Sequence, residues 1–126
     1  MDLLTWTKNF IEYKNSFQRD VINIKKTNIG YEVDTKNGVI DYVVLENLSM
    51  QDFNSQRIVC LNTKENVVWL ANNWDKISQT NAIFLFVDPK NNEHWTIRPK
   101  HHNLIADKTN LKTGLLALME SINVYE

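Results

Sequence analysis

Residues 57–77 read RIVCLNTKENVVWLANNWDKI, and this stretch decides the fold. Residues 58–61 are an apolar run of the kind found in a buried strand, and we expect that strand to span Arg57 to Leu61. Asn62 and Glu65 have the spacing of a capping box, which predicts that a helix starts directly behind the strand. The apolar residues of that helix recur three and four apart, on one stripe: Val67, Leu70, Ala71, Trp74 and Ile77. A strand that runs into an amphipathic helix indicates a domain of mixed helices and strands.

Downstream, residues 82–87 are apolar throughout and few in number, which is typical of a central strand covered on both faces. Asp88 to Asn92 is a turn by composition, and residues 93–98 alternate as a second hairpin strand that Pro99 ends. A last helix is predicted from about Asp107 or Thr109. Its predicted buried positions are Leu111, Leu115, Leu118 and Ile122.

Upstream, larger apolar residues at steps of three and four predict one long helix over residues 3–24, with Tyr13 and Phe17 on its buried face. We expect Gly30 to end the helical region by adopting a positive φ angle. Residues 31–35 and 39–45 are predicted to form a hairpin around Lys36-Asn37-Gly38.

These elements predict an α+β fold in which a mixed central sheet of about five strands is flanked by helices, in the order α-β-β-β-α-β-β-α. The 126 residues fit a single domain, 1–126, because this length buries one continuous core. The single cysteine favours a reducing, cytoplasmic location. We expect neither a signal peptide nor a membrane span.

The formal net charge of -1 provides no overall field that would attract nucleic acid. Binding to a polyanion therefore requires a local basic patch. The residues that could form one lie in the C-terminal two thirds of the chain: Arg57, Lys64, Lys90, Arg98, Lys100, Lys108 and Lys112.

The predicted elements follow one another in a recognisable order: the first helix, the hairpin strand that carries Gly38-Val39-Ile40-Asp41, the strand at 57–62, the next helix and the apolar strand. Together they resemble the restriction-endonuclease-like core of the PD-(D/E)XK nuclease superfamily. The resemblance spans residues 3–98. It implies an aspartate on the second strand, matched by Asp41, and an acid-x-lysine on the third strand. Cys60 and Asn62 stand at the last two positions.

A thiol and an amide provide neither the anionic oxygen that Mg²⁺ prefers nor the ammonium that steadies a phosphate. The resemblance therefore implies a catalytically degenerate nuclease fold that binds nucleic acid or a protein partner. A divalent-metal nuclease with displaced groups stays as an alternative, with Mg²⁺ as its cofactor. The candidates for such groups are Glu12, Glu46, Asp52 and Lys64.

The segment from Trp95 to Asn103 contains the residue types that meet phosphates and bases, so Arg98, Lys100 and His101 are nucleic-acid-binding candidates, together with Lys64. Strand alternation predicts that Trp95 itself faces the core. A metal site would need ligands that converge, and adjacent loop histidines seldom do. The residues considered for one are His94, His101, His102, Glu93 and Asp107.

Two further features leave alternatives open. Cys60 precedes a helix N-terminus, which lowers a thiol pKa, yet its apolar strand favours an inert buried cysteine. Trp69 lies off the main stripe of its helix and, if exposed, would suit a homo-oligomeric interaction module with no role in nucleic-acid binding. The sequence thus carries these hypotheses side by side: DNA or RNA binding, a homodimer, and nuclease activity.

Overall fold

The computed structural model describes residues 1–51, 53–54, 56–105 and 108–126, with only the backbone of residues 104, 105 and 108. Asp52 and Asp107 therefore lie outside the described residues. The helices in the described part are α1 (Leu3–Gln18), α2 (Lys64–Asn72), α3 (Trp74–Ile77), α4 (Pro99–Ile105), the 3₁₀ helix η1 (Lys108–Asn110) and α5 (Leu111–Glu120). The strands there are β1 (Val21–Lys26), β2 (Gly30–Thr35), β3 (Gly38–Val44), β4 (Arg57–Leu61), β5 (Ile83–Asp88) and β6 (Glu93–Ile97).

The described strands form one mixed sheet of six, whose order β1-β2-β3-β4-β5-β6 follows the chain. The first three strands are antiparallel, β3, β4 and β5 are parallel, and β6 returns antiparallel to β5. The predicted α+β class is thus confirmed, and so is the predicted parallel pairing across the crossover helix. The predicted number of about five strands is one short of the six described here, because the sequence pattern places the residues of β1 in a helix.

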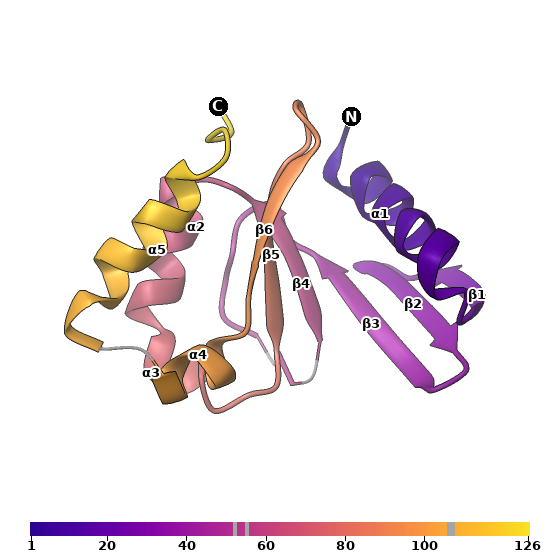
Figure 1. Ribbon diagram of the computed structural model, residues 1–126, viewed down its shortest axis with the longest axis horizontal. Helices are drawn as coiled ribbons and strands as arrows, with labels where there is room; N and C mark the ends of the chain where they lie inside the picture. The colour runs from indigo at the N-terminus through magenta and orange to yellow at the C-terminus, as the bar shows by residue number, and fades with distance from the viewer. Residues whose placement is uncertain (52, 55, 106–107) are drawn as a thin grey trace.

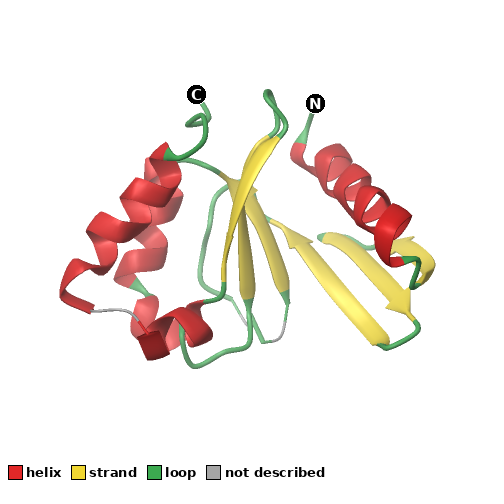
Figure 2. Cartoon of the chain, in the orientation of Figure 1, coloured by secondary structure: helices red, strands yellow, loops and turns green. Residues whose placement is uncertain are grey.

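Helices cover both faces of the sheet, as Figures 1 and 2 show. α1 lies over one face and buries Leu3, Trp6 and Ile11 against inward side chains of β2 to β5. The opposite face packs against α2, α3 and α5. The buried residues of that second cluster include Ile58, Cys60, Val67, Leu70, Trp74, Phe84, Phe86, Trp95 and Leu115.

The predicted helix over residues 3–24 ends early, at Gln18. Arg19 adopts the left-handed conformation (φ 52°, ψ 37°), and its N–H donates to the carbonyl of Asn15, which closes the helix. The chain then pairs as β1, and a shift of register between Val21 and Asn23 disturbs the strand alternation. Val21 and Ile24 consequently both pack against the α1-side cluster. Their separation of three residues imitates a helical repeat.

The buried face of α1 also differs from the predicted one. Tyr13 and Phe17 are 65% and 71% exposed, whereas Trp6, Thr7 and Ile11 are buried. Gly30 does not end a helix but begins β2, where an added Cβ would overlap the carbonyl oxygen of Tyr42. Glycine is required there because two strands approach too closely for a side chain.

The hairpin and turn predictions around the glycine and asparagine residues are confirmed. β2 and β3 pair up to Thr35 and Gly38, and Gly38 has a φ of 129°. The β5–β6 turn contains Asn92 at φ 52°, a left-handed value that asparagine tolerates well. Asp88 belongs to β5 rather than to the turn, and its carboxylate accepts from the N–H of Lys90.

The helix that follows β4 is capped by Thr63 and not by Asn62. The Thr63 hydroxyl accepts from the N–H of Asn66 at 3.2 Å. The helix predicted to reach Ile77 is interrupted at Asn73, which separates α2 from α3. The predicted capping box therefore lies one residue too early.

The C-terminal part contains a helix that the sequence prediction lacks. Pro99 ends β6 as expected but also starts α4, since its fixed φ suits the first helical position. In α5, Leu115 and Met119 are buried, while Leu118 is 37% exposed and does not belong to the buried stripe.

Candidate nucleic-acid interface

Asp41 is exposed on β3, opposite Glu32 of β2. β3 lies beside β4, as the resemblance requires, and the paired residues Tyr42 and Arg57 fix the register. Since the two strands run parallel, Asp41 lies near the start of β4, whereas Cys60 follows at its far end. At about 3.3 Å per residue, Asp41 and Cys60 lie roughly 13 Å apart along the strand direction. The geometry does not bring them together.

Cys60 is fully buried among the side chains beneath α2 and α5. Burial raises the pKa of its thiol well above the usual value, because a thiolate there would lose its hydration. The alternative of a lowered thiol pKa is thus wrong, and the inert interpretation is supported.

Asn62 is a buried hydrogen-bonding centre. Its side-chain oxygen accepts from the indole N–H of Trp95 at 2.8 Å. Its side-chain amide donates to the carbonyls of Met119 and Asn123, at 3.0 and 3.1 Å. The position that the resemblance matches to a lysine therefore holds the C-terminal segment against the sheet.

The displaced candidates are dispersed. Glu12 is exposed on α1, with its carboxylate 4.0 Å from Lys8, and Lys64 is exposed at the start of α2. Glu46 is exposed in the segment between β3 and β4. Among the residues that the structure describes, no group of three or more His, Cys, Asp or Glu side chains is placed to hold a metal ion.

The histidines also separate. His94 faces α1, with its ring centroid 5.1 Å from that of Phe10. His102 packs edge-on against Trp74 on the opposite side, at 5.6 Å, and His101 is exposed on α4. They do not form one cluster.

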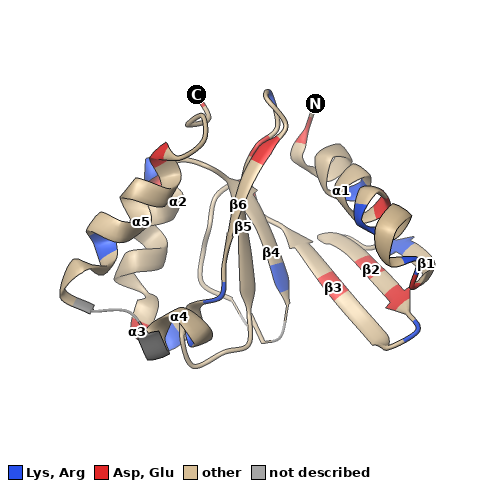
Figure 3. Cartoon of the chain, in the orientation of Figure 1, with Lys and Arg blue, Asp and Glu red and all other residues tan. Residues whose placement is uncertain are grey.

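Basic side chains gather at the end of the sheet where β4 and β5 begin. Strand pairing aligns Tyr42, Arg57 and Ile83 in one row, and the next position along that row, just beyond β6, is Arg98. Figure 3 shows basic positions at the start of β4 and at the junction of β6 with α4. Residues in one row of a sheet face the same side, so the two arginines face the α1 side.

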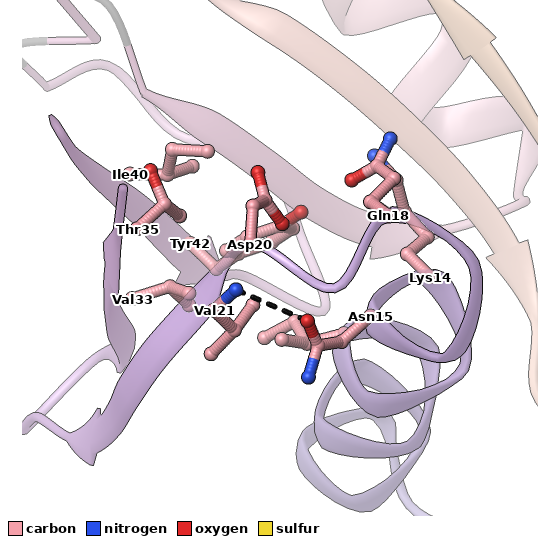
Figure 4. Close-up of a pocket in the computed structure, with 10 residues that line it drawn as sticks. Lys14, Asn15, Gln18, Asp20, Val21, Val33, Thr35, Ile40 and Tyr42 are labelled. Carbon is pink, nitrogen blue, oxygen red and sulfur yellow. Dashed lines mark hydrogen bonds between the residues drawn. The ribbon is translucent and has the colours of Figure 1, made fainter. Parts of the chain in front are cut away.

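Lys14 of α1 belongs to the same group of charges. Partial burial lowers its pKa, the arginines at 57 and 98 lower it further, and Asp20 opposes them. Figure 4 shows Lys14 and Gln18 extending in the same direction from α1, while Asn15 turns to accept from the N–H of Val21. The hollow drawn there has a volume of only about 30 Å³, room for a water molecule.

Three of the four predicted nucleic-acid contacts line one hollow. Arg98, Lys100 and His101 surround a volume of about 340 Å³ together with Asn81 and the start of β5. The Lys100 ammonium donates to the Asn81 side chain at 3.3 Å. We call this the basic hollow. Lys64 does not join it, because α2 starts at the opposite end of the parallel strands.

A second hollow, of about 430 Å³, lies between α1 and the β5–β6 turn. The Trp6 and Phe10 rings stack at 5.1 Å and an angle of 12°, and the His94 ring meets both edge-on. Its rim includes Tyr13 and two asparagines. We call this the aromatic hollow, and its full lining is Trp6, Asn9, Phe10, Tyr13, Asn92 and His94.

One strand connects the two hollows. His94 and Arg98 are four residues apart on β6 and its extension, with exposed Thr96 between them. His94 and Thr96 pair with Val87 and Leu85, whose side chains pack on the α1 side, and strand alternation places Arg98 on that side too. The sequence predicts the basic residues but not the aromatic hollow, since α1 and β6 are too far apart in the chain for any motif to reveal their contact.

Trp95 and Trp69, the two tryptophans singled out in the sequence, both pack inward. Trp95 is buried and stacks on Phe86 at 4.3 Å, so its predicted core position is confirmed. Trp69 is half-buried and contacts Phe53 edge-on at 5.9 Å. The exposure that would make Trp69 an anchor for a second copy is therefore largely missing.

None of the helices in the described ranges combines the length and apolar character that a membrane crossing requires. No protein-family model, no curated protein and no solved structure matches this chain.

Proposed function

We propose that this protein binds nucleic acid along the α1-facing side of β6, from the basic hollow to the aromatic hollow. The observation that carries the proposal is the convergence of Lys14, Arg57 and Arg98 on one side of the sheet, with Lys100 beside them. Clustered cations release counterions from a polynucleotide and so supply most of the affinity.

The proposal concerns binding rather than cleavage. Cys60 and Asn62 occupy the positions that the resemblance assigns to the nuclease acid and lysine, and both are fully buried. A buried thiol and an amide engaged in three hydrogen bonds support a structural role for this strand end. With a single free cysteine, we propose a reducing cytoplasm as the compartment.

Fluorescence anisotropy with labelled DNA and RNA oligonucleotides of about 12 nucleotides tests the proposal, with salt varied from about 50 to 200 mM. We expect the logarithm of the affinity to fall linearly with the logarithm of the salt concentration. Removing the charge of Arg98 or Lys100 by substitution with alanine should reduce that slope by about 0.7–1 for each phosphate that the variant no longer neutralises.

Lys36→Ala is the matched control, because Lys36 is likewise an exposed cation, at the β2–β3 turn, remote from β6 in the sheet order. It changes the net charge as Arg98→Ala does. If both variants weaken nucleic-acid binding equally, the binding depends only on the overall charge of the protein, which would contradict the proposed site. Affinity no greater than that of an acidic control protein would remove the function altogether.

A further inference from the structure

We infer that the aromatic hollow holds one unpaired nucleobase of the bound strand, so that the protein selects single-stranded over duplex nucleic acid. This inference rests on the proposed function and names its ligand class. Base stacking on aromatic side chains beside a cationic backbone track is the usual way in which proteins hold single strands.

The hollow offers aromatic surface that is not consumed by the core. Trp6 is buried beneath the stack, and the half-buried Phe10 has the Lys14 ammonium over its ring, so the open aromatic surface is that of Tyr13, which is 65% exposed one turn along the same helix. His94 lies across the opening from α1. The volume of about 430 Å³ falls in the ordinary range for small-ligand pockets.

Two side-chain amides, those of Asn9 and Asn92, stand at the rim of the hollow. The Asn92 side-chain oxygen accepts from the indole N–H of Trp6 at 2.8 Å, which turns its amide N–H groups away from that bond. Asn9 lies on the helix side of the same hollow. Side-chain amides that face a stacked base can pair with its hydrogen-bonding edge.

A cation that can meet the phosphate of such a base lies at the edge of the hollow. The Lys14 ammonium is 5.5 Å from the centroid of the Phe10 ring. It interacts electrostatically with Arg57 and Arg98, which mark the direction of the basic hollow. About 13 Å of strand separates His94 from Arg98. With a base in the aromatic hollow and its phosphate at Lys14, the backbone of the following nucleotides would run over β6 toward the basic hollow.

The electrostatics of the hollow favour an uncharged ring opposite α1. Partial desolvation and the charge of Lys14 lower the pKa of His94, which favours the neutral imidazole. A neutral imidazole meets the Trp6 and Phe10 rings edge-on without repelling Lys14. A base inside a duplex is already stacked and paired, so its faces cannot enter the hollow without unpairing.

Anisotropy titrations of the full chain should compare a single-stranded oligonucleotide, the same backbone with abasic residues, and the matching blunt duplex. Tyr13→Ala should weaken binding of the intact single strand about tenfold and leave the abasic strand unaffected, because the substitution removes only stacking. Since Tyr13 is exposed, the variant should fold as the wild type does, and a matching thermal melt checks this.

Ile22→Ala is the control, because Ile22 is an exposed apolar residue of β1 that does not line the hollow, whereas the Phe17 ring meets the Tyr13 ring edge-on at 5.2 Å. Equal weakening for intact and abasic strands, or a duplex bound as tightly as the single strand, would overturn the nucleobase site. So would a Tyr13-dependent dimer in sedimentation, which would assign the hollow to a second copy. If Arg98→Ala still reduces the salt dependence of binding when the nucleobase site has been overturned, the proposed nucleic-acid binding remains supported and only the base site is lost.

Discussion

The indole N–H of Trp95 donates to the side-chain oxygen of Asn62 across 33 residues of chain. The same asparagine holds the carbonyls of Met119 and Asn123, so β6, β4 and the end of α5 meet at one buried amide. All three bonds lie on the side of the sheet that faces away from α1. This centre fixes β6, whose other side carries the proposed binding surface.

Asn62→Ala should lower the free energy of unfolding by about 2–4 kcal/mol, because it leaves a buried indole N–H and two carbonyls without their partner. Urea unfolding followed by tryptophan fluorescence measures the change. Asn72→Ala, at an exposed position on α2, should stay within about 0.5 kcal/mol of the wild type. Similar midpoints for the two variants would show that the amide centre contributes little.

Two glycines should respond in opposite directions to alanine. At Gly30 the new Cβ would overlap the Tyr42 carbonyl, so β2 and β3 must separate, and we expect a loss of about 2 kcal/mol or more. At Gly114, within α5, a Cβ meets nothing within 4 Å, so alanine should add about 0.5–1 kcal/mol. Denaturant midpoints at unchanged slope test both. A tolerated Gly30→Ala would contradict the close strand approach.

Cys60 should be unreactive in the folded protein. Full burial and a raised thiol pKa leave almost no accessible thiolate, so a disulfide reagent at pH 8 should label it only after denaturant is added. Mass spectrometry of protein labelled with and without urea gives the answer. Rapid complete labelling of the native chain would mean that β4 is far more accessible than the structure indicates.

Stability should decrease on mild acidification, in part through His94. Partial desolvation of the imidazole, and then the charge of Lys14, lower the pKa of His94 in the folded protein. Its contribution is therefore complete above the unfolded value of about 6.5 and is lost as the pH falls through the lower folded pKa, since the unfolded chain binds the proton more readily.

His94→Gln should make the unfolding free energy less dependent on pH between about 6.5 and 5, as measured by urea titrations at each pH. Lys14→Met should flatten the dependence only partly, because it removes the neighbouring charge and leaves the burial. A wild-type slope in His94→Gln would assign the effect to other groups.

The sequence is sufficient for the elements whose signals are local. The apolar run of β5, the Lys36-Asn37-Gly38 hairpin and the α2 stripe each depend on residues close together in the chain, and each prediction is confirmed in outline. β1 is not predictable in this way. Its irregular register places Val21 and Ile24 on one side, at a spacing that is helical in an ordinary sequence.

The candidate site likewise contains residues that the local sequence predicts and residues that it does not. Arg98, Lys100 and His101 are neighbours in sequence and do share a hollow, so composition alone locates them. The contact of Phe10 with His94 joins positions 84 residues apart, and nothing within either segment indicates it. The local pattern at Asn62 predicts a helix cap. It misses the actual partners of the side chain because they come from distant segments.

The agreement between strand order and chain order bears on how the protein is made. As the nascent chain leaves the ribosome, each new strand can join the edge formed by the one before it, without threading through finished structure. β6 joins after the other five described strands, and the Asn62 centre that holds it is complete only once Asn123 has emerged. Synthesis from the N-terminus would therefore assemble the proposed binding edge late.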